Sequence, residues 1–130
     1  MEKHLFERGL ALFNSGHFFD AHEVLEDVWR EAPRHGHSRR HLQGLVQLAV
    51  AFHHQSTGNW VGACSVLKRA LRNMEGAEDS FPEIDWEGLR GSLEPWPKYL
   101  AEACENDPGS QPPPPLPKIF LGDGQTKKVT

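Results

Sequence analysis

The sequence is poor in cysteine and in long apolar runs. Its two cysteines, Cys64 and Cys104, form no CxxC motif and are too few for a disulfide framework, so we expect a reduced, cytoplasmic protein. The longest apolar run, Leu48 to Phe52, is far shorter than the roughly 20 residues that span a bilayer. The first residues lead into an amphipathic pattern instead of the apolar core of a signal peptide, so no association with a membrane is expected.

Clustered positive charge is also missing. The 14 lysines and arginines are scattered among 18 aspartates and glutamates, which leaves a formal net charge of −4. Proteins that bind nucleic acid normally concentrate basic residues on one surface, so nucleic acid is not an expected partner. With 130 residues, 38% of them hydrophobic and 25% charged, the chain has the size and composition of one soluble globular domain.

Apolar residues recur at helical spacing through most of the chain, which predicts an all-α fold of five to six helices. The expected helices cover residues 5–13, 18–31, 39–56 and 60–75, followed by a short helix capped by Asp85 and another that opens at Pro97 and runs to about Glu105. The helix over 39–56 is apolar on most of its circumference and should lie at the centre. We therefore predict one helical domain over residues 1–105 and an irregular, proline-rich tail over 106–130, with polyproline II over 112–117.

The first four predicted helices show a weak internal repeat with a period of 42 residues. It aligns Gly16 with Gly58, Ala21 with Ala63 and Leu25 with Leu67. The pattern predicts two antiparallel, tetratricopeptide-like helical hairpins with the C-terminal helices as a cap. In the same alignment His22 falls on Cys64 and Glu26 falls on Lys68, so the hairpin architecture does not itself require His22 or Glu26.

The second predicted helix carries polar residues on a side that should face its neighbours. His22, Glu26 and Trp29 lie at i, i+4 and i+7 and therefore form one row along the helix. Burying an unpaired polar group costs about 1–3 kcal/mol, so His22 and Glu26 should have partners.

A polar line on the third predicted helix offers those partners. Gln43, Gln47 and His54 lie at i, i+4 and i+11 of a helix that is otherwise apolar. If the second and third helices pack together, Gln47 and His54 can reach His22 and Glu26. The group is then either a structural hydrogen-bond network or a ligand-binding site, and both interpretations stay open. As a ligand site it would comprise His22, Glu26, Trp29, Gln47 and His54.

Two kinds of catalysis would use the same residues. His22 and Glu26, with His53 or His54, could supply three nitrogen and oxygen ligands to a divalent metal ion. Alternatively, a histidine held by a carboxylate could act as a general acid or base. No nucleophile stands beside His22 in the sequence, and a histidine–glutamate pair on one helix is a common pattern. No cofactor is therefore predicted, and a divalent metal is kept as an alternative.

Other conspicuous residues have simpler interpretations. The four tryptophans should be apolar anchors, with Trp29 and Trp60 in the core and Trp86 and Trp96 on the short C-terminal helices. The histidines around the loop after Pro33 should be solvated, namely His35, His37 and His41. Cys64 should pack on the apolar stripe of its helix. The proline-rich tail should lie across the domain or remain disordered, in preference to recruiting a proline-binding domain.

Several segments together resemble domain-of-unknown-function family 309, a small all-helical family of bacteria and archaea. These segments are Phe18 to Arg30, Leu42 to Ala49, Gly58-Asn59 and Gly62-Ala63. The signature of this family is His-x-x-x-Glu-x-x-Trp, which His22, Glu26 and Trp29 match. The resemblance covers about residues 3–75 and implies a helical fold and a signature of suspected functional importance, without an agreed activity.

We therefore expect a protein of unknown function whose helical domain is non-catalytic and binds a small ligand or a protein partner near His22, Glu26 and Trp29. The alternative is a metal-assisted or acid–base hydrolase that uses the same cluster, so whether the protein is an enzyme stays open. The identity of the ligand and the oligomeric state also stay open, with a homo-oligomer among the alternatives.

Overall fold

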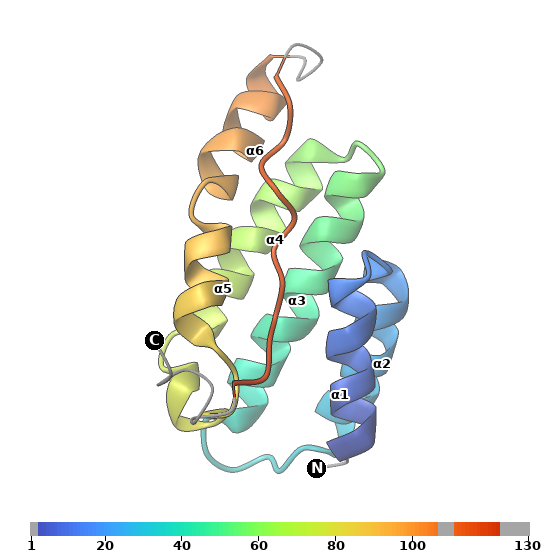
Figure 1. Ribbon diagram of the computed structural model, residues 1–130, viewed down its shortest axis with the longest axis vertical. Helices are drawn as coiled ribbons and strands as arrows, with labels where there is room; N and C mark the ends of the chain where they lie inside the picture. Colours follow the sequence, from blue (N-terminus) through green and yellow to red (C-terminus); the bar gives the residue numbers. More distant parts are fainter. Residues whose placement is uncertain (1–2, 107–110, 123–130) are drawn as a thin grey trace.

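Six α-helices and one short 3-10 helix make up the fold, which a computed structural model describes over residues 3–106 and 111–122 (Figure 1). They are α1 (Lys3–Asn14), α2 (Phe18–Glu31), α3 (Ser38–Ser56), α4 (Trp60–Asn73), η1 (Ala77–Asp79), α5 (Trp86–Leu93) and α6 (Trp96–Glu105). These residues include no β-strand, only an isolated bridge between Ile84 and Leu121. The predicted all-α fold is confirmed. Across the same residues, no helix combines the length and hydrophobicity needed to traverse a bilayer.

The first four helices lie side by side and run in alternating directions, whereas α5 and α6 follow one another in the same direction (Figure 1). α1 packs against α2, α2 against α3, and α3 against α4, while α6 packs on the far side of α4. The first four helices therefore form two hairpins in a row, and α5 and α6 run back along the second hairpin. The likeness of these hairpins to tetratricopeptide repeats stays a prediction.

The turns inside the two hairpins use the glycines that the 42-residue repeat aligns. Gly16 and Gly58 both adopt a φ of +82°, in the left-handed region that glycine enters without a Cβ clash. The alanines that follow them, Ala21 and Ala63, are both fully buried at the start of the next helix. The repeat thus marks structurally equivalent positions.

α3 is the central helix, as its apolar circumference predicts. It contacts both α2 and α4, and Leu42, Leu45 and Leu48 are completely buried. Gly44 allows α3 to approach the end of α4 closely. A Cβ at this position would lie 3.1 Å from both the Ala70 carbonyl oxygen and the Met74 backbone nitrogen. Gly44 thus sets the distance between α3 and the end of α4.

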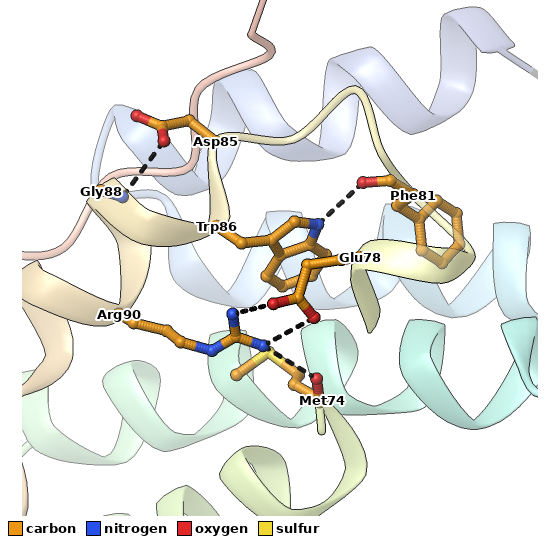
Figure 2. Close-up of polar contacts among 7 residues, drawn as sticks. All are labelled: Met74, Glu78, Phe81, Asp85, Trp86, Gly88 and Arg90. Carbon is orange, nitrogen blue, oxygen red and sulfur yellow. Dashed lines mark hydrogen bonds and ion pairs between the residues drawn. The ribbon is translucent and has the colours of Figure 1, made fainter. Parts of the chain in front are cut away.

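The C-terminal helices are anchored by tryptophan, as predicted for Trp86 and Trp96, both of which are buried. The indole nitrogen of Trp86 donates to the Phe81 carbonyl at 2.7 Å, and Asp85 caps α5 by accepting from the Gly88 backbone nitrogen at 3.1 Å (Figure 2). Trp29 and Trp60 differ slightly from expectation, because both are half-buried and pack against the edge of the core.

Residues 111–122, here called the strap, run back along the domain without helix or strand (Figure 1). Ile119 inserts into the core with only 1% of its surface exposed. Of the two expectations for the tail, the strap thus follows the one in which it lies across the domain. Its polyproline II conformation and the domain boundary near residue 106 stay predictions, and the rest of the tail lies outside the described residues.

Candidate functional site

The predicted row on α2 lies at the edge of the core, where α2 meets α3. Ala21, Leu25 and Val28 occupy the buried side of α2 and hold the helix in place. The side chains of His22 and Glu26 lie beside that buried stripe and keep 24% and 37% of their surface exposed. The two polar groups therefore contact the protein on one side and solvent on the other.

A groove of about 230 Å³ separates α2 from α3 at this place. Its lining consists of His22, Glu26 and Trp29 from α2, and Gln43, Val46, Gln47 and Val50 from α3. The structure thus brings together four of the five predicted site residues and adds Gln43 from the same polar line. Because His22, Glu26 and Trp29 are three, four or seven positions apart on one helix, two packed helices are sufficient to form the site.

Glu26 is the charged group at the centre of the groove. One carboxylate oxygen, Oε1, accepts from the Arg30 guanidinium at 2.8 Å, and Arg30 also binds Asp27 at 2.7 Å. The other oxygen, Oε2, lies 3.8 Å from His22 Nε2, which is too long for a hydrogen bond. Within the described part of the chain, the His22 ring makes no hydrogen bond. His22 and Glu26 Oε2 can therefore still engage a ligand.

Trp29 forms the wall at the far end of the row. Its indole Nε1 is buried and has no hydrogen-bond partner among the described residues, which normally costs about 1–3 kcal/mol. The Arg39 guanidinium lies over the indole ring, 4.0 Å from its centroid, and donates to the Ala32 carbonyl at 3.1 Å. The indole is therefore held by packing and by a cation–π contact.

The predicted partnership of Gln47 and His54 with His22 and Glu26 is not formed in the described structure. Gln47 lines the groove, but its Oε1 accepts from Asn73 Nδ2 of α4 at 2.7 Å and so links α3 to α4. His54 lies near the end of α3, where its Nδ1 is 3.3 Å from Asn59 Nδ2, and it does not line the groove. The sequence alone could not show that Gln47 and His54 have other partners, because Asn73 and Asn59 come near them only in the packed fold.

The described residues do not gather a metal-binding cluster. Across 3–106 and 111–122, no three His, Cys, Asp or Glu side chains form a group that could hold a metal ion. His53 lies instead against the exposed ring of Phe19, with 5.3 Å between the ring centroids. The weak metal candidates His22, Glu26, His53 and His54 therefore gain no structural support.

The two cysteines lie much closer together than their separation in sequence suggests. Partial removal from solvent raises the pKa of the Cys104 thiol, and the neighbouring Cys64 raises it further. Cys64 belongs to α4 and Cys104 to α6, which pack together. A raised pKa keeps the thiol protonated, which is the opposite of an activated nucleophile.

His41 is buried, contrary to the expectation of a solvated loop histidine, whereas His35 and His37 are exposed as predicted. It belongs to the first turn of α3 and is only 2% exposed. Its Nδ1 lies 2.6 Å from the Ser80 hydroxyl, and its Nε2 lies 3.3 Å from the Arg40 guanidinium. Burial and the charge of Arg40 lower the pKa of His41 from its ordinary value of 6.5.

A second hollow, of about 480 Å³, lies beside α5 and has Glu78, Trp86 and Arg90 in its lining. The Arg90 guanidinium binds both oxygens of Glu78, approaches the Met74 carbonyl at 3.5 Å and lies 5.6 Å from the Trp86 ring (Figure 2). The hydrogen bond from Arg90 lowers the pKa of Glu78 below its ordinary 4.5. Because Arg90 and Glu78 already satisfy each other, this hollow has less to offer a ligand than the α2–α3 groove.

The fold and the groove define a small helical domain whose distinguishing residues are His22, Glu26 and Trp29. The model of a protein family described as a domain of unknown function (DUF309) matches residues 6–66 of the chain, so this part of the chain is similar to that family. The match includes α2, α3 and all but the first three residues of α1, and therefore every residue that lines the groove.

Two curated bacterial proteins are similar to the chain. An uncharacterized protein of Aquifex aeolicus (strain VF5) is 32% identical over 93 residues, which are 72% of this chain and 28% of that protein. The uncharacterized protein YpuF of Bacillus subtilis (strain 168) is 34% identical over 67 residues, which are 52% of this chain and 38% of that protein. The matched part thus spans well under half the length of either relative.

Proposed function

We propose that this is a binding domain whose α2–α3 groove receives a small cationic group, either of a small ligand or of a side chain on a protein partner. The observation that carries the proposal is the groove itself, which gathers a carboxylate, an imidazole, an indole ring and two carboxamides from two helices. A volume of about 230 Å³ is below the range of drug-sized sites, about 300–1,000 Å³, and fits a single side chain or a ligand of similar size.

The charge around the groove favours a cation. α2 carries five acidic residues and one arginine, which gives it a formal charge of −4, as large as that of the whole chain. Arg30 occupies only one oxygen of Glu26, so Oε2 can accept from an incoming ammonium or guanidinium group. The carboxamide oxygen of the exposed Gln43, which also lines the groove, suits the same kind of group.

The experiment that tests this proposal is a titration followed by ¹H–¹⁵N NMR. N-acetyl-arginine amide and N-acetyl-lysine amide are the cationic probes, and N-acetyl-glutamine amide is the neutral control. We expect saturable shifts at the Trp29 indole and the Gln43 and Gln47 carboxamides with the cationic probes only. Glu26→Gln should weaken binding at least about fivefold, since a charge-assisted hydrogen bond contributes about 1.5–3 kcal/mol where it is desolvated and less at a half-exposed site.

Glu23→Gln is the matched control, because Glu23 is an exposed glutamate of the same helix outside the groove. It removes the same charge from α2 and should weaken binding less than twofold. Absence of saturable shifts, or equal losses in Glu26→Gln and Glu23→Gln, would show that the groove does not bind a cation. His22→Ala should leave the melting temperature nearly unchanged, because His22 forms no hydrogen bond within the described residues.

A further inference from the structure

The strap is held by a polar clamp that recognises its backbone. The Asn14 side chain, at the end of α1, donates from Nδ2 to the Ile119 carbonyl at 2.8 Å and accepts at Oδ1 from the Ile119 backbone nitrogen at 2.7 Å. A single carboxamide thus satisfies both backbone groups of one residue, as a neighbouring strand would. The Asn14 carbonyl also accepts from Lys118 Nζ at 2.8 Å.

A second contact lies toward the start of the strap, on α6. The indole nitrogen of the fully buried Trp96 donates to the Pro115 carbonyl at 3.1 Å. Tyr99 packs edge-on against Trp96, with 5.5 Å between the ring centroids, and lines a hollow together with Pro112 and Pro114. Aromatic side chains that combine an apolar face with a hydrogen bond to a proline carbonyl are the usual means of binding an extended proline-rich segment.

The side chains of the strap alternate between the domain and solvent. Pro117 and Ile119 are buried, whereas Leu116, Lys118 and Phe120 are exposed. The surface between α1 and α6 therefore contacts every second residue of the strap. These contacts are to the carbonyl of Pro115, the ring of Pro117, and both the backbone and the side chain of Ile119. In sequence terms this is Pro-x-Pro-x-Ile.

We propose that the surface around Asn14 and Trp96 is a binding site for extended Pro-x-Pro-x-Ile segments, that the strap fills it within the same chain, and that such a segment of another protein chain competes for it. The hydrogen bonds from Asn14 and Trp96 go to the strap backbone, so they do not depend on covalent attachment to α6. The strap and Trp96 lie beyond the residues matched by the family model, whereas Asn14 lies within them.

Because the strap belongs to the same chain as its site, it competes strongly with any free segment. A short linker keeps the strap at an effective concentration in the millimolar range, so a free segment of ordinary affinity is excluded until the strap is released. The test is therefore to cut the linker while keeping every residue present. A recognition sequence for a site-specific protease is inserted between residues 108 and 109 of the full chain, and a fluorescent peptide with the sequence of residues 111–122 is added before and after cleavage.

We expect the peptide to bind the cut chain at least about tenfold more tightly than the intact chain, measured by fluorescence anisotropy. Asn14→Ala should weaken binding to the cut chain about tenfold or more, because two hydrogen bonds are lost. A peptide with aspartate in place of Ile119 should not bind. Asn73→Ala is the matched control, since that asparagine bonds Gln47 instead of the strap, and it should bind the peptide as the unmodified chain does.

Circular dichroism of the cut chain shows whether the domain stays folded without a covalently attached strap. A folded cut chain is expected if the strap occupies a binding site, and an unfolded one if the strap is an essential part of the fold. If the cut chain unfolds, if the peptide fails to bind it, or if Asn14→Ala binds as tightly as Asn73→Ala, the proposal is wrong. Concentration-dependent dimers of the intact chain that Asn14→Ala abolishes would support it, because a second copy would then supply the strap.

Discussion

Two helical glycines should respond in opposite ways to the same substitution. Gly44 lies within α3 and Gly91 within α5, and alanine is preferred over glycine in a helix by about 0.8–1 kcal/mol. A Cβ at Gly91 meets nothing within 4 Å, so Gly91→Ala should gain most of that preference. A Cβ at Gly44 would lie 2.5 Å from Met74 Cγ and 3.1 Å from two backbone atoms of α4.

The magnitude for Gly44→Ala follows from these contacts. The Met74 side chain can rotate, but the Ala70 carbonyl and the Met74 nitrogen belong to the end of α4 and cannot move alone. Overpacking of this kind costs about 1–3 kcal/mol, and contact with backbone places it near the upper end. After the helix preference is subtracted, Gly44→Ala should destabilise the protein by about 2 kcal/mol.

Thermal unfolding followed by circular dichroism measures both variants. For a domain of 130 residues, an unfolding entropy of about 2.1 cal/mol/K per residue makes 1 kcal/mol equivalent to about 4 °C. Gly91→Ala should therefore raise the melting temperature by about 3–4 °C, and Gly44→Ala should lower it by about 7 °C. A rise for both variants would refute the inference that α3 and α4 are packed to their limit at Gly44.

Further tests address His41 and the cap of α5. The pKa of His41 is lower in the folded chain than the ordinary 6.5, so the unfolded chain binds more protons between these two pKa values. The stability that comes from keeping His41 neutral is therefore complete above pH 6.5 and is lost as the pH falls below 6.5. His41→Gln should flatten this part of a plot of melting temperature against pH, and an unchanged slope would show that another group titrates. Asp85→Ala should cost about 0.5–2 kcal/mol of unfolding free energy in a urea titration, because the cap of α5 is lost. Asp85→Asn should retain most of that cap, and an equal loss in both would point to the charge instead.

The sequence predicted the helices because their determinants are local. The predicted helix over 18–31 coincides with α2, and the one over 39–56 differs from α3 by a single residue, since apolar spacing and the stop at Pro33 act within a few positions. The same local rules placed Asp85 at the start of α5. Helical spacing also predicted one wall of the groove, because His22, Glu26 and Trp29 share a helix face.

The sequence could not predict pairings that only the packed fold creates. His41 looked like a loop histidine because its partner Ser80 lies 39 residues later. Gln47 and His54 were expected to turn toward α2, but asparagines from α4 and its cap bind them instead. Helix propensity could not indicate that Ile119, in a proline-rich tail, is a core residue, because its backbone is bound by Asn14, 105 residues earlier.

The clamp between Asn14 and Ile119 also sets an order of events during biosynthesis. α1 and α2 can pair as soon as they leave the ribosome, but Asn14 has to wait for a residue 105 positions later. At a translation rate of about 5–20 residues per second, this interval is on the order of 5–20 seconds. For that time the nascent chain presents the carboxamide of Asn14 without the strap, and the site that also needs Trp96 is complete only shortly before the strap is made.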